Sequence, residues 1–207
     1  ERAGLRRVTG AALGAGVALL ALAKLVGYQA GWEHGVDELF FYAKLGGAAI
    51  PAARQGLFFL SDDDGNTKLG FVDLGGRVET LAGDVGGLSL GRPYSGGTFS
   101  VADDGSFVFT LSRPDHPADV AVGRRGARIE RLTRLNDDLF GHKELAVVEE
   151  VRFKSSFDGR EIQGWIAKPP GFDPSEKYPL ILEIHGGRFA NYGDRFSAEV
   201  QLYAAAG

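Results

Sequence analysis

One short run in this 207-residue sequence fits the pattern that surrounds a serine nucleophile. Gly87-Leu88-Ser89-Leu90-Gly91 matches G-x-S-x-G, in which a sharp turn exposes a serine hydroxyl for attack on an acyl group. Such a turn needs a buried strand before it and a helix after it. Here the run is followed by Arg92-Pro93-Tyr94-Ser95-Gly96-Gly97, which is typical of a loop, so Ser89 is not assigned as a nucleophile.

A second run, Asp62-Asp63-Asp64-Gly65-Asn66, has carboxylates spaced as at the start of a calcium loop. The glutamate expected at the twelfth loop position is replaced by Asp73, and a hairpin turn explains the run better. The sequence has no cysteine, which removes thiol nucleophiles and disulfides, and its glycine pairs lack the lysine of a phosphate loop. We predict no metal and no cofactor.

Composition narrows the fold and the partners. Glycine accounts for 31 residues without any low-complexity run, which indicates many tight turns and argues against a helical bundle. The formal net charge of −4 offers no basic surface for a phosphate backbone, so nucleic acid is excluded as a partner.

Residues 1–55 are left unassigned, as a signal-like or foreign segment. Basic residues precede the uncharged run Ala11 to Ala23, which is the outline of a secretory signal peptide but too short to span a bilayer. A membrane protein is therefore not predicted, and the compartment stays open between exported or periplasmic and cytoplasmic, with export favoured. The chain starts at Glu1, lacks methionine and ends within an alanine run, so we expect a fragment.

Residues 56–140 carry two sets of short β-branched and aromatic runs separated by Asp, Gly and Asn turns. The runs lie at 57–60, 68–74 and 78–81, and again at 99–101, 107–111, 119–122 and 129–133. A shift of 51 superposes the sets, placing Phe58 on Phe109, Leu69 on Val120 and Val78 on Ile129. A repeat of this length with four strands per unit predicts two adjacent β-propeller blades, with a β-sandwich as the alternative.

Residues 141–207 have a different pattern from the two repeated sets and indicate the start of another domain. Strand-like runs at 147–153 and 161–167 flank a hairpin-type connection, and the apolar run 178–184 is typical of a strand buried on both faces of an α/β sheet. Residues 196–206 suit a helix, with Phe196, Val200 and Tyr203 on one face.

Three runs together resemble the prolyl oligopeptidase family of serine peptidases, at the crossing from propeller to catalytic domain. They are Lys154-Ser155-Ser156-Phe157-Asp158-Gly159-Arg160-Glu161-Ile162-Gln163-Gly164-Trp165, Lys168-Pro169-Pro170-Gly171-Phe172-Asp173-Pro174 and Tyr178-Pro179-Leu180-Ile181-Leu182-Glu183-Ile184-His185-Gly186-Gly187. The likeness extends from about residue 54 to the end. It implies a mixed fold, in which the C-terminal propeller blades are followed by the first three strands and first helix of an α/β-hydrolase domain.

The resemblance also implies roles for His185, Gly186 and Gly187, which match the family's loop at the mouth of the active site. An N–H of this loop helps to stabilise the tetrahedral oxyanion, and glycines let the backbone approach the substrate carbonyl. Taken alone, the three residues could equally turn the chain after a strand. The family's Ser, Asp and His triad would lie beyond residue 207.

We therefore expect part of a peptidase that cleaves short peptides through an acyl-enzyme and that is inactive as this chain alone. Two alternatives stay open: an esterase or lipase on the same fold, and a non-catalytic propeller-type binding module. The predicted partners are small peptides, and the sequence leaves a homo-oligomer open.

Arg188 departs from the proline that the family usually has after this loop. Proline fixes φ near −65° and arginine does not, so we predict that Arg188→Pro in a complete protein raises kcat about fivefold, in line with the ~0.4–1 kcal/mol gained at a compatible proline. Steady-state kinetics on a peptide substrate would check this. Equal constants for both forms would show that residue 188 does not tune the loop.

Overall fold

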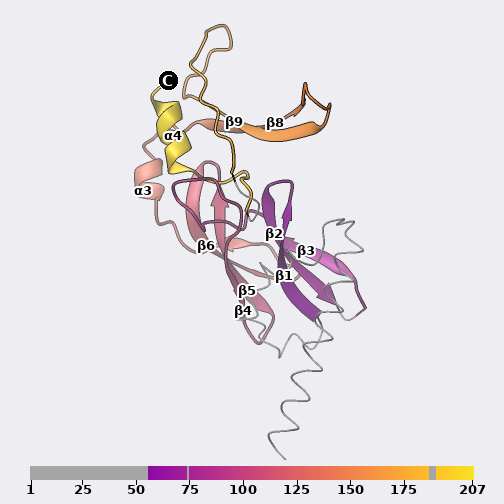
Figure 1. Ribbon diagram of the computed structural model, residues 1–207. Coiled ribbons are helices and arrows are strands. Elements are labelled where there is room, and N and C mark those ends of the chain that lie inside the picture. The colour runs from indigo at the N-terminus through magenta and orange to yellow at the C-terminus, as the bar shows by residue number, and fades with distance from the viewer. Residues whose placement is uncertain (1–55, 74, 187–189) are drawn as a thin grey trace, which may run out of the picture.

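The structure of the protein is a computed structural model that describes residues 56–73, 75–186 and 190–207 (Figure 1). The signal-like run Ala11 to Ala23, Gly187 and Arg188 lie outside the described residues. Within the part described, no helix is long and apolar enough to cross a membrane.

Two antiparallel sheets follow each other along the chain. The first has the order β1-β2-β3, with β1 at Gly56–Asp63, β2 at Asn66–Asp73 and β3 at Val78–Ala82. The second has the order β4-β5-β6-β7, with β4 at Phe99–Val101, β5 at Ser106–Arg113, β6 at His116–Arg124 and β7 at Glu130–Arg131. Both are simple meanders, in which each strand pairs with its neighbour in the sequence.

The predicted repeat is confirmed at the level of strands. β5 and β6 occupy the places of β1 and β2 after a shift of about fifty residues, and β7 falls on β3. The β1–β2 turn and the β4–β5 turn use left-handed backbone: Asp64 and Gly65 have φ of +51° and +79°, and Gly105 before β5 has +80°. Aspartate and glycine tolerate this conformation, which explains their recurrence at the turns.

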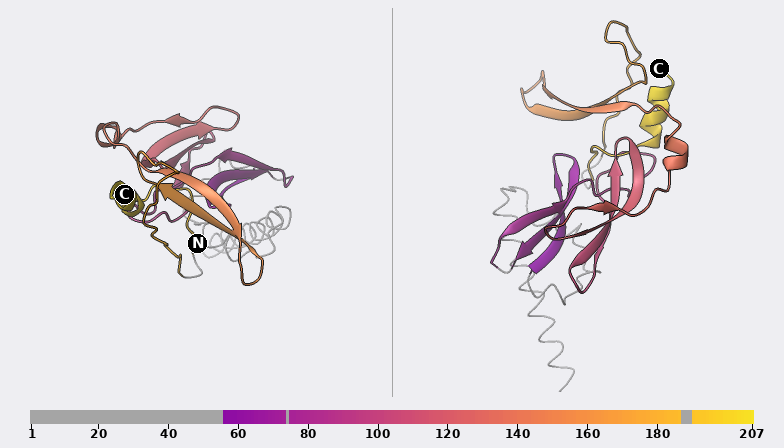
Figure 2. Two further views of the ribbon diagram at one scale, coloured as in Figure 1. Left: turned by 90° about the horizontal axis from the view of Figure 1, so that it is seen from above. Right: turned by 180° about the vertical axis from the view of Figure 1, so that it is seen from behind.

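The two sheets lie side by side and share one core (Figure 2). A single sheet of three or four strands leaves both faces wet, so each sheet here buries one apolar face against the other. The buried members of the core come from both sheets and, at Val85, from the connection between them: Leu60, Leu69, Ala82, Val85, Val101, Phe107, Phe109 and Ala121. Phe107 joins the sheets directly, with its ring centroid 6.2 Å from those of Phe58 and Phe109.

The chain then leaves the second sheet through a short helix, α3 (Asp137–Phe140), and forms a separate hairpin of β8 (Val147–Lys154) and β9 (Glu161–Lys168). The hairpin confirms the two strands predicted there, and its turn is closed by hydrogen bonds between Ser155 and Arg160 and between Gly159 and Ser155.

The strand expected over 178–184 is not formed. This segment is irregular, and its side chains are exposed, at 82% for Leu180 and 76% for Ile184. A strand requires a neighbour for its main-chain hydrogen bonds. Among the described residues β8 and β9 pair only with each other, so an apolar run alone does not make a strand here.

The helix expected near the C-terminal end is present as α4 (Ala198–Ala205), and Phe196, which was expected on one face with Val200 and Tyr203, lies just before it and is buried. Ser197 caps it by accepting a hydrogen bond from the Val200 N–H at 3.2 Å. Gln201 and Ala204 are the buried helix residues, whereas Tyr203 is 44% exposed. The polar Gln201 side chain faces inward because it accepts from the Ala146 N–H at 2.8 Å and donates to the Pro114 carbonyl.

Truncating Phe107 tests the shared core. We expect Phe107→Ala to lower the free energy of unfolding by about 3–5 kcal/mol, because it opens a cavity between the sheets. The neighbouring Val108 points out of the core and is 37% exposed, so Val108→Ala should cost less than about 1 kcal/mol. Urea denaturation of both variants would check this, and equal losses would argue against a single core.

Candidate active site

His185 lies against the loop that connects the two sheets. Its ring packs edge-on against Tyr94 of that loop, with centroids 5.7 Å apart, and against Tyr192, with centroids 4.6 Å apart. Tyr94 and Tyr192 also contact each other at 5.0 Å and form a main-chain bridge. The three rings therefore form one aromatic cluster, which joins the end of the exposed segment 178–184 to the first part of the chain.

Arg92, on the same loop, forms a polar cluster beside these rings. Its guanidinium pairs with the Glu183 carboxylate, donates to the Tyr192 hydroxyl at 3.1 Å and lies 3.2 Å from the Glu199 carboxylate. The Tyr192 hydroxyl in turn donates to Glu183 at 3.0 Å. The hydrogen bond to Tyr192 and the nearby charge of Glu183 raise the pKa of Arg92, while burial raises that of Tyr192.

Main-chain hydrogen bonds fix the loop at 87–97 to the segment at 190–199. The Ser95 N–H donates to the Asn191 carbonyl, and the Gly193 N–H donates to the Pro93 carbonyl. At the start of α4, the Ala198 N–H donates to the Leu90 carbonyl, and the Ser197 hydroxyl donates to the Gly91 carbonyl at 2.7 Å.

The G-x-S-x-G run thus has a structural role in the described chain. It lies between β3 and β4 without an adjoining strand or helix, and the Ser89 hydroxyl accepts from the Arg92 N–H at 3.1 Å, which closes a turn. Its context is not that of a nucleophile.

The acidic turn at 62–66 also has partners within the chain. Asp62 accepts from the hydroxyls of Thr67 and Ser95 at 2.5 and 2.9 Å, and Asp64 pairs with Arg152 of β8 at 3.1 Å. The carboxylates therefore point to separate partners instead of converging on one point. A side chain at Gly65 would collide with the ring of Trp165, so the turn is packed against the hairpin.

Sequence reasoning missed the surroundings of His185. Arg92 and Tyr94 looked like ordinary loop residues, and Glu183 like part of a buried strand. Arg92 and Glu183 are 91 positions apart in the sequence, so no local spacing could have joined them.

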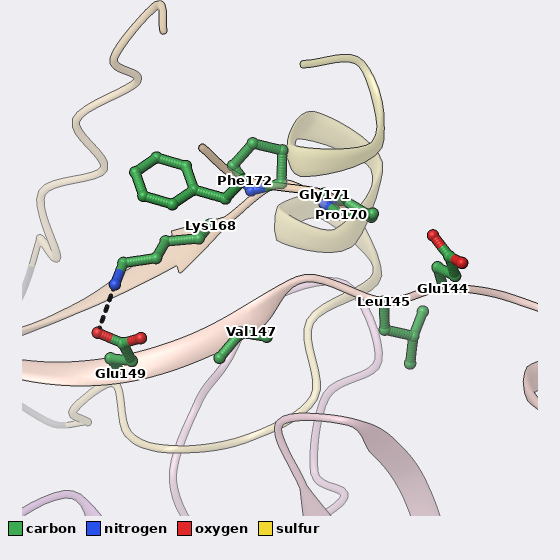
Figure 3. A pocket seen from close by; sticks show the side chains of 9 residues that line it. Glu144, Leu145, Val147, Glu149, Lys168, Pro170, Gly171 and Phe172 are labelled. Carbon is green, nitrogen blue, oxygen red and sulfur yellow. Dashed lines mark hydrogen bonds and ion pairs between the residues drawn. The ribbon is translucent and has the colours of Figure 1, made fainter. Parts of the chain in front are cut away.

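A surface groove lies away from His185, on the β8–β9 hairpin. Its volume is about 580 Å³, and it follows one edge of the hairpin and the loop after it (Figure 3). Lys168 crosses it, with its ammonium 2.7 Å from Glu149 and 5.4 Å from the ring centroid of Phe172. None of the described groove residues belongs to the cluster around His185, so the groove does not define this site.

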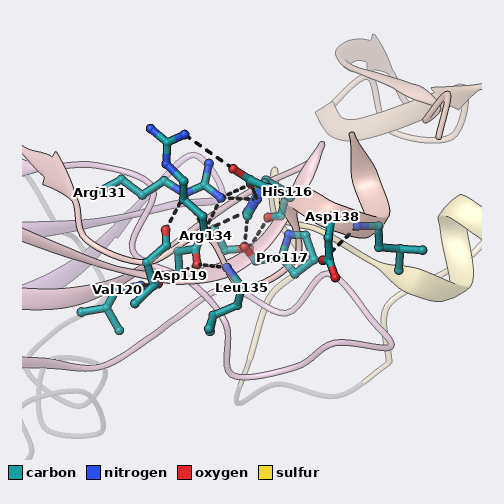
Figure 4. A network of polar contacts seen from close by, with 12 residues as sticks. His116, Pro117, Asp119, Val120, Arg131, Arg134, Leu135 and Asp138 are labelled. Carbon is teal, nitrogen blue, oxygen red and sulfur yellow. Dashed lines mark hydrogen bonds and ion pairs between the residues drawn. The ribbon is translucent and has the colours of Figure 1, made fainter. Parts of the chain in front are cut away.

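A second polar network fixes the exit from the second sheet (Figure 4). The Asp119 side chain on β6, 1% exposed, accepts from the Thr133 hydroxyl at 2.6 Å, from the Leu135 N–H at 3.1 Å and from Arg131 of β7 at 2.5 Å. Burial alone would raise the pKa of Asp119, but these hydrogen bonds and the charge of Arg131 outweigh it and hold the pKa below its ordinary value.

Comparison of sequences finds peptidases. The chain is 28% identical over 153 residues to the uncharacterized peptidase YuxL of Bacillus subtilis, covering 74% of this chain and 22% of YuxL. It is 28% identical over 102 residues to a probable dipeptidyl-aminopeptidase B of Penicillium rubens, covering 47% of this chain and 11% of that protein. No protein-family model matches. The chain thus spans less than a quarter of the length of these relatives.

Comparison of structures finds acylaminoacyl peptidases. The Pyrococcus horikoshii enzyme matches with a TM-score of 0.57 and 25% identity, over 73% of this chain and 22% of that one. An acylaminoacyl peptidase in complex with Z-Gly-Gly-Phe-chloromethyl ketone matches with a TM-score of 0.58 and 25% identity, over 74% and 22%.

The Asp119 network predicts a pH dependence of stability. A carboxyl whose folded pKa is lowered stabilises the fold above its unfolded pKa, and this contribution is lost as pH falls through the folded pKa. The stability advantage of the native chain over Asp119→Asn should therefore shrink below about pH 4. Urea denaturation at pH 7 and pH 3 would check this, with Asp138→Asn, at an exposed neighbour, as control. An advantage that stays constant would contradict it.

Proposed function

We propose, from the relationship of this chain to peptidases of the prolyl oligopeptidase family, that it contributes to a serine peptidase that cleaves short peptides through an acyl-enzyme. The likeness to peptidases in both sequence and structure, over almost three quarters of the chain, carries the proposal. Residues 56–140 would be propeller blades, and residues 141–207 the start of the α/β-hydrolase domain.

The surroundings of Gly186 support a role for the His185–Gly186 loop at the oxyanion. A side chain at Gly186 would meet nothing within 4 Å among the described residues, and its φ is not in the left-handed region. Among the described residues, neither packing nor backbone conformation therefore requires a glycine there, which supports a role beyond a turn. A missing side chain leaves room for a substrate carbonyl to approach the main-chain N–H groups.

In the proposed reaction, the serine hydroxyl attacks the peptide carbonyl and a histidine takes its proton. The carbonyl oxygen then carries the negative charge that loop N–H groups stabilise, and the amine leaves with the proton from histidine. The resulting acyl-serine ester is hydrolysed by water. The described residues of this chain would supply only the oxyanion donors, since Ser89 lies in the wrong context.

The packed sheets favour small substrates. Blades that stand beside a catalytic domain restrict the approach of folded proteins, and peptides can still enter. A peptide-like chloromethyl ketone is bound by one of the similar structures, which supports peptide substrates here.

An assay of this chain beside the full-length gene product tests the proposal. We expect the full-length protein to cleave peptidyl-arylamides and to be inactivated by Z-Gly-Gly-Phe-chloromethyl ketone. The 207 residues alone should show no turnover, because they lack a nucleophile in suitable context.

Three results would count against it. Turnover by the 207 residues alone would show that the nucleophile is within them. Cleavage of aryl esters without arylamides would favour the esterase alternative, and inactivity of the full-length protein on both would favour a binding module.

A further inference from the structure

We propose that Arg92 is a positioning residue, which orders the His185–Gly186 loop by holding Glu183. The proposal rests on the proposed function, because it assigns that loop to the oxyanion. It makes a residue of the first half of the chain, on the loop between the two sheets, part of the active-site machinery without contact to the reacting atoms.

Among the described residues, the segment before His185 makes few contacts. Leu180, Ile181, Leu182 and Ile184 are all more than 60% exposed, and no regular element includes them. Within the described chain, the side-chain hydrogen bonds of residues 179–186 are those of Glu183, which are made with Arg92 and Tyr192. Within the part of the chain that the structure describes, the Arg92 contact and the aromatic packing of His185 are therefore what attach this segment.

Arg92 is itself well anchored. Its N–H donates to the Ser89 hydroxyl, and its guanidinium reaches Glu199 in the first turn of α4 at 3.2 Å. A guanidinium has five donors in a planar fork, so its Nε can face Glu199 while Nη1 reaches Glu183 and Tyr192, whereas the three donors of a lysine share one nitrogen. The Arg92 guanidinium thus connects three parts of the chain. They are the loop between the sheets, α4 and the segment before His185.

Order in this loop matters for the rate more than for binding. An oxyanion donor contributes when it is already in place as charge develops, and a donor that must be ordered during the reaction loses part of its effect. Loss of Arg92 should therefore lower kcat and leave KM nearly unchanged.

The network offers matched controls. Glu183 and Glu199 are both carboxylates on Arg92, but only Glu183 lies in the segment before His185. If Arg92 merely docks α4, Glu199→Gln should mimic Arg92→Ala; if it orders the loop, Glu183→Gln should do so. Arg124→Ala breaks another exposed pair, with Asp104, far from this loop in the second sheet.

The experiment uses the full-length protein with a peptidyl-arylamide substrate. We expect Arg92→Ala and Glu183→Gln each to lower kcat about tenfold with KM changed less than about twofold, less than the 10²–10³ for complete loss of a donor. The double variant should be no worse than either single one. Glu199→Gln, which removes an anchor of Arg92 but not its contact with the segment before His185, should lower kcat less than Glu183→Gln does. Arg124→Ala should stay near the native rate, and Arg92→Lys should recover part of the loss.

Amide hydrogen exchange at residues 183–186 gives a second readout that does not need activity. Exchange should accelerate in Arg92→Ala and Glu183→Gln, and less in Glu199→Gln. Unchanged exchange and unchanged kcat, or equal effects of the two glutamate variants, would overturn the proposal. If the native protein has no peptidase activity, the proposed function fails, and exchange still decides whether Arg92 orders the loop.

Discussion

Main-chain hydrogen bonds between the loop at 87–97 and the start of α4 join parts of the molecule that are far apart in sequence. The first N–H groups of any helix have no partner within it. Here the Ala198 and Glu199 N–H groups donate to the carbonyls of Leu90 and Gly91, so the helix start is completed by a loop about a hundred residues earlier. The same loop carries Arg92 and Tyr94, and the surroundings of His185 therefore depend on this attachment.

Glycine permits the close contacts on either side of this attachment. A side chain at Gly193 would collide with the carbonyl of Gly65, and one at Gly65 would collide with Trp165. The acidic turn is thus enclosed by the hairpin and by the segment that leads to α4. Its carboxylates form ion pairs with Lys68 and Arg152. The run that resembles the start of a calcium loop is therefore used for contacts within the chain.

Exposed and buried polar contacts contribute differently to the stability of this protein. The Arg92 contacts are partly exposed, and such pairs contribute little to stability. Asp119, in contrast, is enclosed and fully hydrogen-bonded, and its loss would leave several donors without a partner. The Arg92 cluster can therefore orient a loop, whereas the Asp119 network stabilises the edge of the second sheet.

The sequence alone determined the elements that depend on local chemistry. The alternating runs, the Asp and Gly turns and the 51-residue repeat predicted both sheets, because side-chain alternation and left-handed turn residues act over a few positions. The hairpin at 147–168 and the helix near 198–205 followed for the same reason. The motif at 185–187 pointed to a catalytic loop through its likeness to a family.

Only the tertiary structure decided the remainder. The run at 178–184 has the composition of a buried strand and is irregular, since a strand exists only beside a partner. Gln201 is buried because distant main-chain groups at Ala146 and Pro114 form hydrogen bonds with it. The cluster of Arg92, Glu183 and His185 is likewise a product of folding, because side chains from separate parts of the chain meet only once the loop between the sheets is attached to α4.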